Sequence, residues 1–171
     1  RGGSMVRGAL DSLKRANRNT KGVILDLRYN PGGLLDEAVN VCGLFINGNQ
    51  LVVSTKGKSA EWDKDYKTLG SPWDEKMPLT VLTNRNSASA SEIVAGTMQD
   101  LDRGVVVGQR SFGKGLVQTT RSLSFNAKLK VTTAKYYTPS GRCIQALDYS
   151  HRNEDGSVGE IPDSIKTKFK T

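Results

Sequence analysis

The chain has 171 residues, 36% of them hydrophobic and 25% charged, a composition typical of one globular domain rather than a disordered segment. No apolar run reaches the length of a membrane span, and nothing at the N-terminus reads as a secretion signal. The formal net charge is +8, but the Lys and Arg are scattered and lack interleaved aromatic residues, which argues against a nucleic-acid-binding protein.

Hydrophobic periodicity predicts helices and strands through the first half of the chain. The expected elements are an amphipathic helix over 4–17 capped by Ser4, a buried strand over 22–27, a helix over 34–45 and a strand over 50–54. Residues 56–77 are predicted to form a long polar loop, and loops of that length are usually functional or small subdomains.

The second half continues the alternation. We expect a buried strand over 79–83, a helix from Ser89 or Ser91 to Asp100, and strands over 104–108, 116–120 and 129–137. Residues 147–171 are polar with little to bury, so they are predicted to be a tail that adds a partial element to a core of residues 1–146. This order of elements predicts an α/β fold in layers.

The loop Asn30-Pro31-Gly32-Gly33 joins a buried strand to a helix. Its glycines leave backbone N–H groups able to face a ligand near a positive helix end, which suits an oxyanion hole or a carboxylate cradle. A plain strand-to-helix turn explains the spacing equally well.

Ser89 lies in a run of small residues, Ser87-Ala-Ser-Ala-Ser-Glu92, that also follows a strand and opens a helix. Ser89 with Glu92 fits a capping box, and on this pattern alone capping is the favoured role. The same position suits a nucleophile, because the helix N-terminus is positive and the Ala90 amide can donate to an oxyanion.

Lys114 lies in Gly108-Gln-Arg-Ser-Phe-Gly-Lys-Gly115, a near match to a phosphate-binding loop. Gly115 replaces the Ser or Thr that would hold Mg²⁺, and a strand rather than a helix follows, so nucleotide binding is disfavoured. A lysine in an apolar pocket favours its neutral form and can take the proton of a serine. A solvated lysine in a glycine turn is the ordinary alternative.

The positions of histidine and cysteine argue against a Ser-His-Asp triad and a metal site. The single His, His151, lies in the polar tail, which makes a Ser-His-Asp triad improbable. Cys42 and Cys143 match no metal spacing; Cys42 is expected in the core, and a disulfide between the two stays open. We expect no metal and no cofactor.

Four segments together resemble the C-terminal processing peptidases, also called tail-specific proteases. They are 22–34 with its Asn-Pro-Gly-Gly loop, 87–92, 111–118 and 138–145, and the resemblance covers about residues 4–146. Lys114 follows Ser89 by 25 residues, a separation that matches the family.

The resemblance implies a ClpP/crotonase-like fold, with a mixed sheet and flanking helices. It makes Ser89 the nucleophile, Lys114 its base and Gln118 the group that orients the lysine. The oxyanion hole would combine the Ala90 amide with that of Gly32 or Gly33, without deciding between the two glycines.

The resemblance also implies a serine endopeptidase that cleaves proteins near unstructured C-termini, outside the cytoplasm, in the bacterial periplasm or cell envelope. Members usually carry a PDZ module, which this chain lacks. Because the chain also starts without Met, we expect a piece of a longer protein. The alternative is an inactive fragment or relative that binds peptide tails as an adaptor. Membrane association and oligomeric state stay open.

Overall fold

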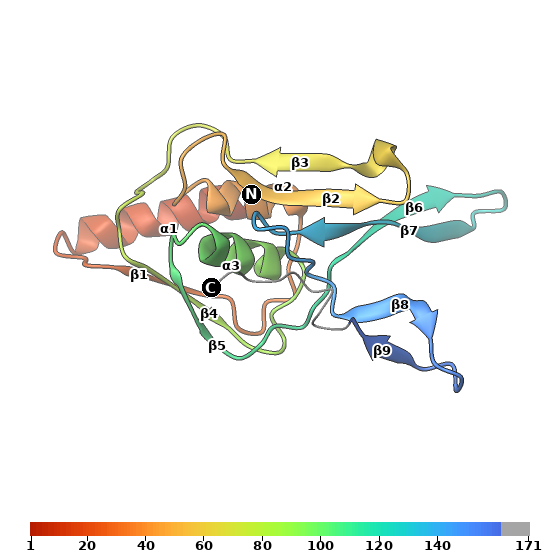
Figure 1. Cartoon of the computed structure of the whole chain (residues 1–171). Helices are drawn as coiled ribbons and strands as arrows, with labels where there is room; N and C mark the ends of the chain where they lie inside the picture. The colour runs from red at the N-terminus through yellow and green to blue at the C-terminus, as the bar shows by residue number, and fades with distance from the viewer. Residues whose placement is uncertain (162–171) are drawn as a thin grey trace.

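The computed structural model describes residues 1–161, and Figure 1 shows the arrangement of their helices and strands. The helices are α1 (Gly2–Ala16), α2 (Leu35–Cys42), the 3-10 helix η1 (Ala60–Trp62) and α3 (Ala90–Asp100). The strands are β1 (Val23–Asp26), β2 (Leu51–Gly57), β3 (Lys64–Lys67), β4 (Leu79–Thr83), β5 (Val105–Gly108), β6 (Leu116–Ser122), β7 (Lys128–Tyr137), β8 (Leu147–Arg152) and β9 (Val158–Glu160).

The strands form three separate sheets. A parallel sheet has the order β1-β4-β5, an antiparallel sheet has the order β3-β2-β7-β6, and β8 pairs with β9. In Figure 1, α3 lies between the antiparallel sheet above it and the parallel strands below it. The predicted α/β layering is confirmed, with parallel and antiparallel strands in different sheets.

The core surrounds α3. Eight of its eleven residues are buried, which is expected of a helix enclosed between two layers rather than lying on a surface. Met98 of α3, Phe45 and Val52 are fully buried in one cluster. Thr97 adds a polar link, because its hydroxyl donates to the Val52 carbonyl oxygen of β2 at 2.9 Å.

Two sequence predictions in the first half need correction. Helix α1 begins at Gly2 with Arg1 as its N-cap, so Ser4 lies inside the helix and its hydroxyl donates to the Arg1 carbonyl oxygen. The predicted loop over 56–77 contains η1 and β3. Strand β3 has only Tyr66 half-buried, so it lacks the apolar alternation that reveals a strand, and its pairing with β2 defines it instead.

The polar tail also contains regular structure. Strands β8 and β9 form a hairpin, and Ile161 is buried beyond it, with its amide bonded to the Ala146 carbonyl oxygen. The remainder of the predicted tail, residues 162–171, lies outside the described residues.

Both cysteines are free thiols in the structure. Cys42 is fully buried in α2, as predicted, and burial raises the pKa of its thiol to about 12. Cys143 is half-buried. Within residues 1–161, none of the helices has the length and apolar character needed to cross a bilayer.

Candidate active site

Ser89 has a strained backbone at the start of α3. It is the N-cap of the helix, with φ +57° and ψ −118°. Non-glycine residues rarely adopt this conformation, which costs of order 1–3 kcal/mol and occurs most often at functional sites. The half-buried Ser89 side chain is therefore presented by a turn that the surrounding structure must hold in place.

The residues just before Ser89 anchor that turn to the end of β1. The fully buried Ser87 hydroxyl donates to the Leu27 carbonyl oxygen at 2.7 Å and accepts from the Asn84 amide at 2.9 Å. The Ala88 amide donates to the Asn30 carbonyl oxygen at 3.0 Å. These bonds bring the Asn30–Gly33 loop against the serine turn, as the functional interpretation of both loops requires.

Gly32 makes the contact between the two loops. Its φ is +97°, and a Cβ there would lie 2.6 Å from the Ala88 carbonyl oxygen and 2.7 Å from the Ala90 nitrogen. No side chain larger than hydrogen fits at that separation. The loop is therefore more than a generic turn, because contact with the Ser89 turn requires a glycine at this position.

The structure distinguishes the two glycines as hydrogen-bond donors. The Gly32 amide donates to Asn30 Oδ1 at 2.9 Å, so it is already engaged. The amides of Gly33 and Ala90 have no hydrogen-bond partner among the described residues, and Gly33 is exposed. Two amides near Ser89 are thus able to donate to a ligand.

Glu92 connects the serine turn to the segment that carries Lys114. Its carboxylate is buried and accepts four hydrogen bonds, from the Ser89 amide at 2.8 Å, the Ser111 hydroxyl at 2.7 Å, the Gly113 amide at 2.6 Å and the Lys114 amide at 2.8 Å. The predicted capping arrangement of Ser89 and Glu92 is confirmed. No sequence pattern indicated that the same carboxylate also accepts hydrogen bonds from a loop about 20 residues away.

Gln145 supports the lysine segment from its other side. The Gly115 amide donates to Gln145 Oε1 at 2.9 Å, and a Cβ on Gly115 would lie 2.3 Å from the Gln145 nitrogen. Gln145 is buried, and its own amide donates to the Leu147 carbonyl oxygen. The backbone of Lys114 is therefore fixed between Glu92 and the 144–146 segment.

The side chains of Lys114 and Gln118 are both exposed. Within residues 1–161, no hydrogen bond joins Ser89 Oγ to Lys114 Nζ, and Gln118 Nε2 instead donates to Thr132 Oγ1 at 3.4 Å. The dry pocket expected for a neutral lysine is not formed by the described residues. The structure brings the Ser89 turn and the Lys114 backbone together through Glu92, but it does not join the two functional groups.

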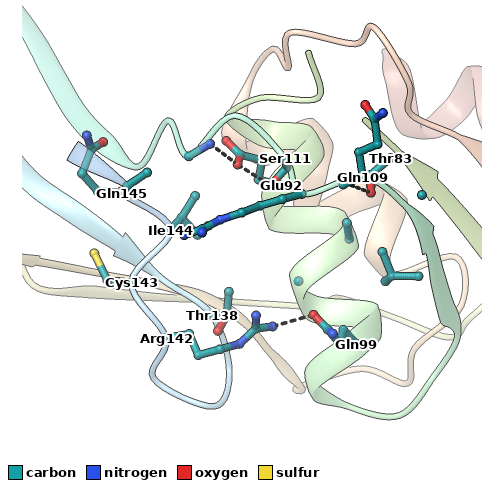
Figure 2. Close-up of a pocket in the computed structure, with 17 residues that line it drawn as sticks. Thr83, Glu92, Gln99, Gln109, Ser111, Thr138, Arg142, Cys143, Ile144 and Gln145 are labelled. Carbon is teal, nitrogen blue, oxygen red and sulfur yellow. Dashed lines mark hydrogen bonds between the residues drawn. The ribbon is translucent and has the colours of Figure 1, made fainter. Parts of the chain in front are cut away.

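A cavity of about 650 Å³ lies beside this site, between α3, β5 and residues 138–146, and Figure 2 shows the residues that line it. Glu92 and Ser111 lie at one end and are joined by a hydrogen bond, while Arg142 reaches Gln99 on α3 at the other end. Ser89 and Lys114 do not line this cavity, which lies on the Glu92 side of the site.

Asp100 fixes the far end of α3. Its buried carboxylate pairs with Arg142 and accepts from the amide and hydroxyl of Ser140. Burial opposes ionisation of this carboxyl, but hydrogen bonds from Thr138, Ser140 and Arg142 outweigh it and lower its pKa. Among residues 1–161, no cluster of His, Cys, Asp and Glu could hold a metal ion.

Known proteins resemble the chain across most of its length. The model of peptidase family S41 matches residues 1–150. A carboxy-terminal-processing protease of Bartonella bacilliformis is 52% identical over 128 residues, 74% of this chain and 29% of that protein. The chloroplastic C-terminal processing peptidase of Tetradesmus obliquus is 38% identical over 135 residues, 79% of this chain and 29% of that protein.

A solved structure shares the fold. The photosystem II D1 C-terminal processing protease superposes with a TM-score of 0.76 at 36% identity, covering 84% of this chain and 36% of that one. The fold expected from the sequence is thereby confirmed. The chain spans between 29% and 36% of the length of these three relatives.

Proposed function

Because the chain belongs to peptidase family S41, we propose that it carries the nucleophile of a serine endopeptidase that cleaves proteins near unstructured C-termini. The observation that supports this function best is the Ser89 turn. A strained serine at a helix N-terminus, beside two unpartnered amides, has the form required for attack on a carbonyl.

In the proposed reaction, Ser89 Oγ attacks the scissile carbonyl and gives up its proton to Lys114. The tetrahedral oxyanion accepts hydrogen bonds from the amides of Ala90 and Gly33. We choose Gly33 over Gly32 because the Gly32 amide is occupied by Asn30. Lys114 then protonates the leaving amine, and water, activated by the same lysine, resolves the acyl-enzyme.

The base needs a rearrangement or further protein around it. Lys114 is exposed, so part of the full-length protein or the bound substrate would have to exclude water from it. Gln118 would then orient the lysine. Glu92 is proposed as the positioning residue of the pair, because it holds the amides of both Ser89 and Lys114.

The substrate is proposed to bind as an extended strand along β6. In the order β3-β2-β7-β6, β6 has one strand neighbour among residues 1–161, so its outer edge offers backbone groups to a peptide. Strand β6 begins at Leu116, two residues after Lys114, so a peptide added there would pass close to the base.

The test uses the full-length protein with a substrate that ends in an unstructured tail. Ser89→Ala and Lys114→Ala should each lower kcat/KM by about 10⁴-fold or more, because both remove a group that acts in the reacting unit. Ser59→Ala and Lys58→Ala are matched controls on exposed residues and should retain full activity. Normal cleavage by either site variant would refute the assignment.

An adaptor that binds tails without cleaving them is the second candidate, supported by the exposure of Lys114, whose side chain makes no hydrogen bond to Ser89 among the described residues. Tail binding without turnover by the full-length protein would favour it.

A PDZ module elsewhere in the full-length protein and a location outside the cytoplasm remain part of the proposal. Partial proteolysis of the full-length protein and cell fractionation would test them.

A further inference from the structure

The positive charge of the chain is concentrated in one stretch. Residues 103–147 contain eight Lys and Arg and no Asp or Glu, whereas the remaining residues carry equal numbers of the two kinds. This stretch therefore accounts for the entire formal charge of +8. Strands β6 and β7 and the turn between them form its middle part.

Residues 118–133, the outer part of β6 and β7 with the turn between them, form an arm of only two strands. Strand β2 pairs with β7 only from Ala134 to Tyr137, so the β7 residues before Ala134 pair with β6 alone. Figure 1 shows this arm projecting away from the helices. An isolated hairpin gains little stability from its own side chains, so folding alone does not explain apolar residues on it.

The two faces of the arm differ: one carries apolar side chains together with Arg121, which pairs with Leu129, and the other is basic. Residues two apart on a strand share a face, and the pairing register of β6 and β7 puts three apolar side chains on the same one. These are Leu123, Leu129 and Val131, which are 52%, 48% and 36% exposed. The opposite face carries Lys128 and Lys130, both exposed.

Phe125 lies at the tip of the arm. It is fully exposed and has φ +59°, followed by Asn126 with φ +57°, in a turn closed by a bond from the Leu123 amide to the Ala127 carbonyl oxygen at 2.8 Å. Such turns favour Asn, Asp and Gly, and a bulky residue at positive φ is unfavourable. The turn therefore exposes an aromatic ring to solvent at a position where its backbone conformation favours Asn, Asp or Gly.

We propose that this arm binds the surface of an anionic lipid bilayer. Phe125 and the apolar face would enter the boundary between headgroups and acyl chains, and Lys128, Lys130 and Arg121 would lie near lipid phosphates. Lysine stems can extend along apolar surface while their charges stay in water. The charge of residues 103–147 disfavours the pairing of this face with the same face of a second copy.

Vesicle co-sedimentation of the full-length protein tests this proposal. Binding is expected to vesicles that contain phosphatidylglycerol and not to vesicles of phosphatidylcholine alone. The double variant Lys128→Glu with Lys130→Glu should bind at least about tenfold more weakly. The matched control, Lys58→Glu with Lys67→Glu, makes the same charge change on exposed residues elsewhere and should bind within about twofold of wild type. No binding to anionic vesicles, or equal loss in both double variants, would overturn the proposal.

Phe125→Trp gives a direct readout of the tip, after subtraction of the emission of Trp62 and Trp73. Its fluorescence should be that of a solvent-exposed indole in the free full-length protein and should shift to the blue when anionic vesicles are added. A blue-shifted emission without vesicles would show that another segment, or a second copy, covers the tip, and would contradict the proposal. Gel filtration of the same sample then distinguishes the two, since only a second copy would change the oligomeric state.

Discussion

Ser89 and Phe125 share a positive φ in opposite surroundings. Their φ values are +57° and +59°. The Ser89 turn is held by the buried side chains of Ser87 and Glu92, whereas Phe125 lies fully exposed in a turn closed by backbone bonds of its own hairpin. A positive φ therefore does not identify a catalytic residue by itself. The buried contacts that maintain the strain are what distinguish the Ser89 turn.

Among the contacts that support the site, the largest effect is expected where its two loops touch. Gly32→Ala adds a Cβ 2.6 Å from the Ala88 carbonyl oxygen and should lower kcat/KM by about 10³-fold, because it displaces the proposed oxyanion donors. Gly33→Ala is the control, since a Cβ there meets nothing within 4 Å and the amide is kept. Steady-state kinetics that rank the two variants equally would contradict this account of the loop.

The next effect comes from the carboxylate behind Ser89. Glu92→Gln replaces an oxygen by an N–H group, and in either orientation that group faces a backbone amide that also donates. We expect kcat to fall about 100-fold with KM little changed, because the nucleophile is displaced while the binding edge remains. Ser111→Ala removes one donor and should cost less. A fall in stability with unchanged kcat would reduce Glu92 to a structural role.

At the other end of α3 from Ser89, the expected effect of changing Asp100 is on the stability of the fold. Asp100→Asn breaks a buried ion pair with Arg142 and should destabilise the protein by about 3 kcal/mol in denaturant unfolding. In the wild type, the lowered pKa of Asp100 means that its contribution is complete above its ordinary value of 3.8 and is lost as pH falls through the lower folded value. The variant should therefore lose less stability than wild type as the pH is lowered below about 4. Parallel curves for the two proteins would refute this.

The smallest effect is expected at the arm. Phe125→Asn places a residue tolerant of positive φ in the turn and should leave stability unchanged or raise it by up to about 1 kcal/mol. Thermal unfolding measures this change. A clear loss of stability would show that the ring of Phe125 packs against protein in the full-length molecule.

Local patterns predicted most of the fold and part of the site. Strands such as Leu79–Thr83 alternate or run apolar, and the helix that begins at Ala90 follows a capping box. Strand β3 was missed because Lys64–Lys67 has almost no apolar residue, and only its partner β2 defines it.

The site itself depended on contacts between distant segments. The four bonds of Glu92 join residues 89, 111, 113 and 114, and no short sequence window contains that relation. The choice between Gly32 and Gly33 required knowing that Asn30 occupies one amide. The exposure of Lys114 likewise depends on which elements cover it, a property that its own Gly-Lys-Gly sequence does not contain.

The Glu92 carboxylate has a consequence for when the nucleophile can become competent. A ribosome supplies Ser89 and Glu92 before it supplies Ser111, Gly113 and Lys114, so a nascent chain that ends earlier has the serine without the bonds that connect its turn to the lysine segment. Strand β5 lies between these two segments in the sequence, and it pairs with β4 in the parallel sheet. The proposed nucleophile can therefore be connected to its proposed base only after synthesis has passed Lys114.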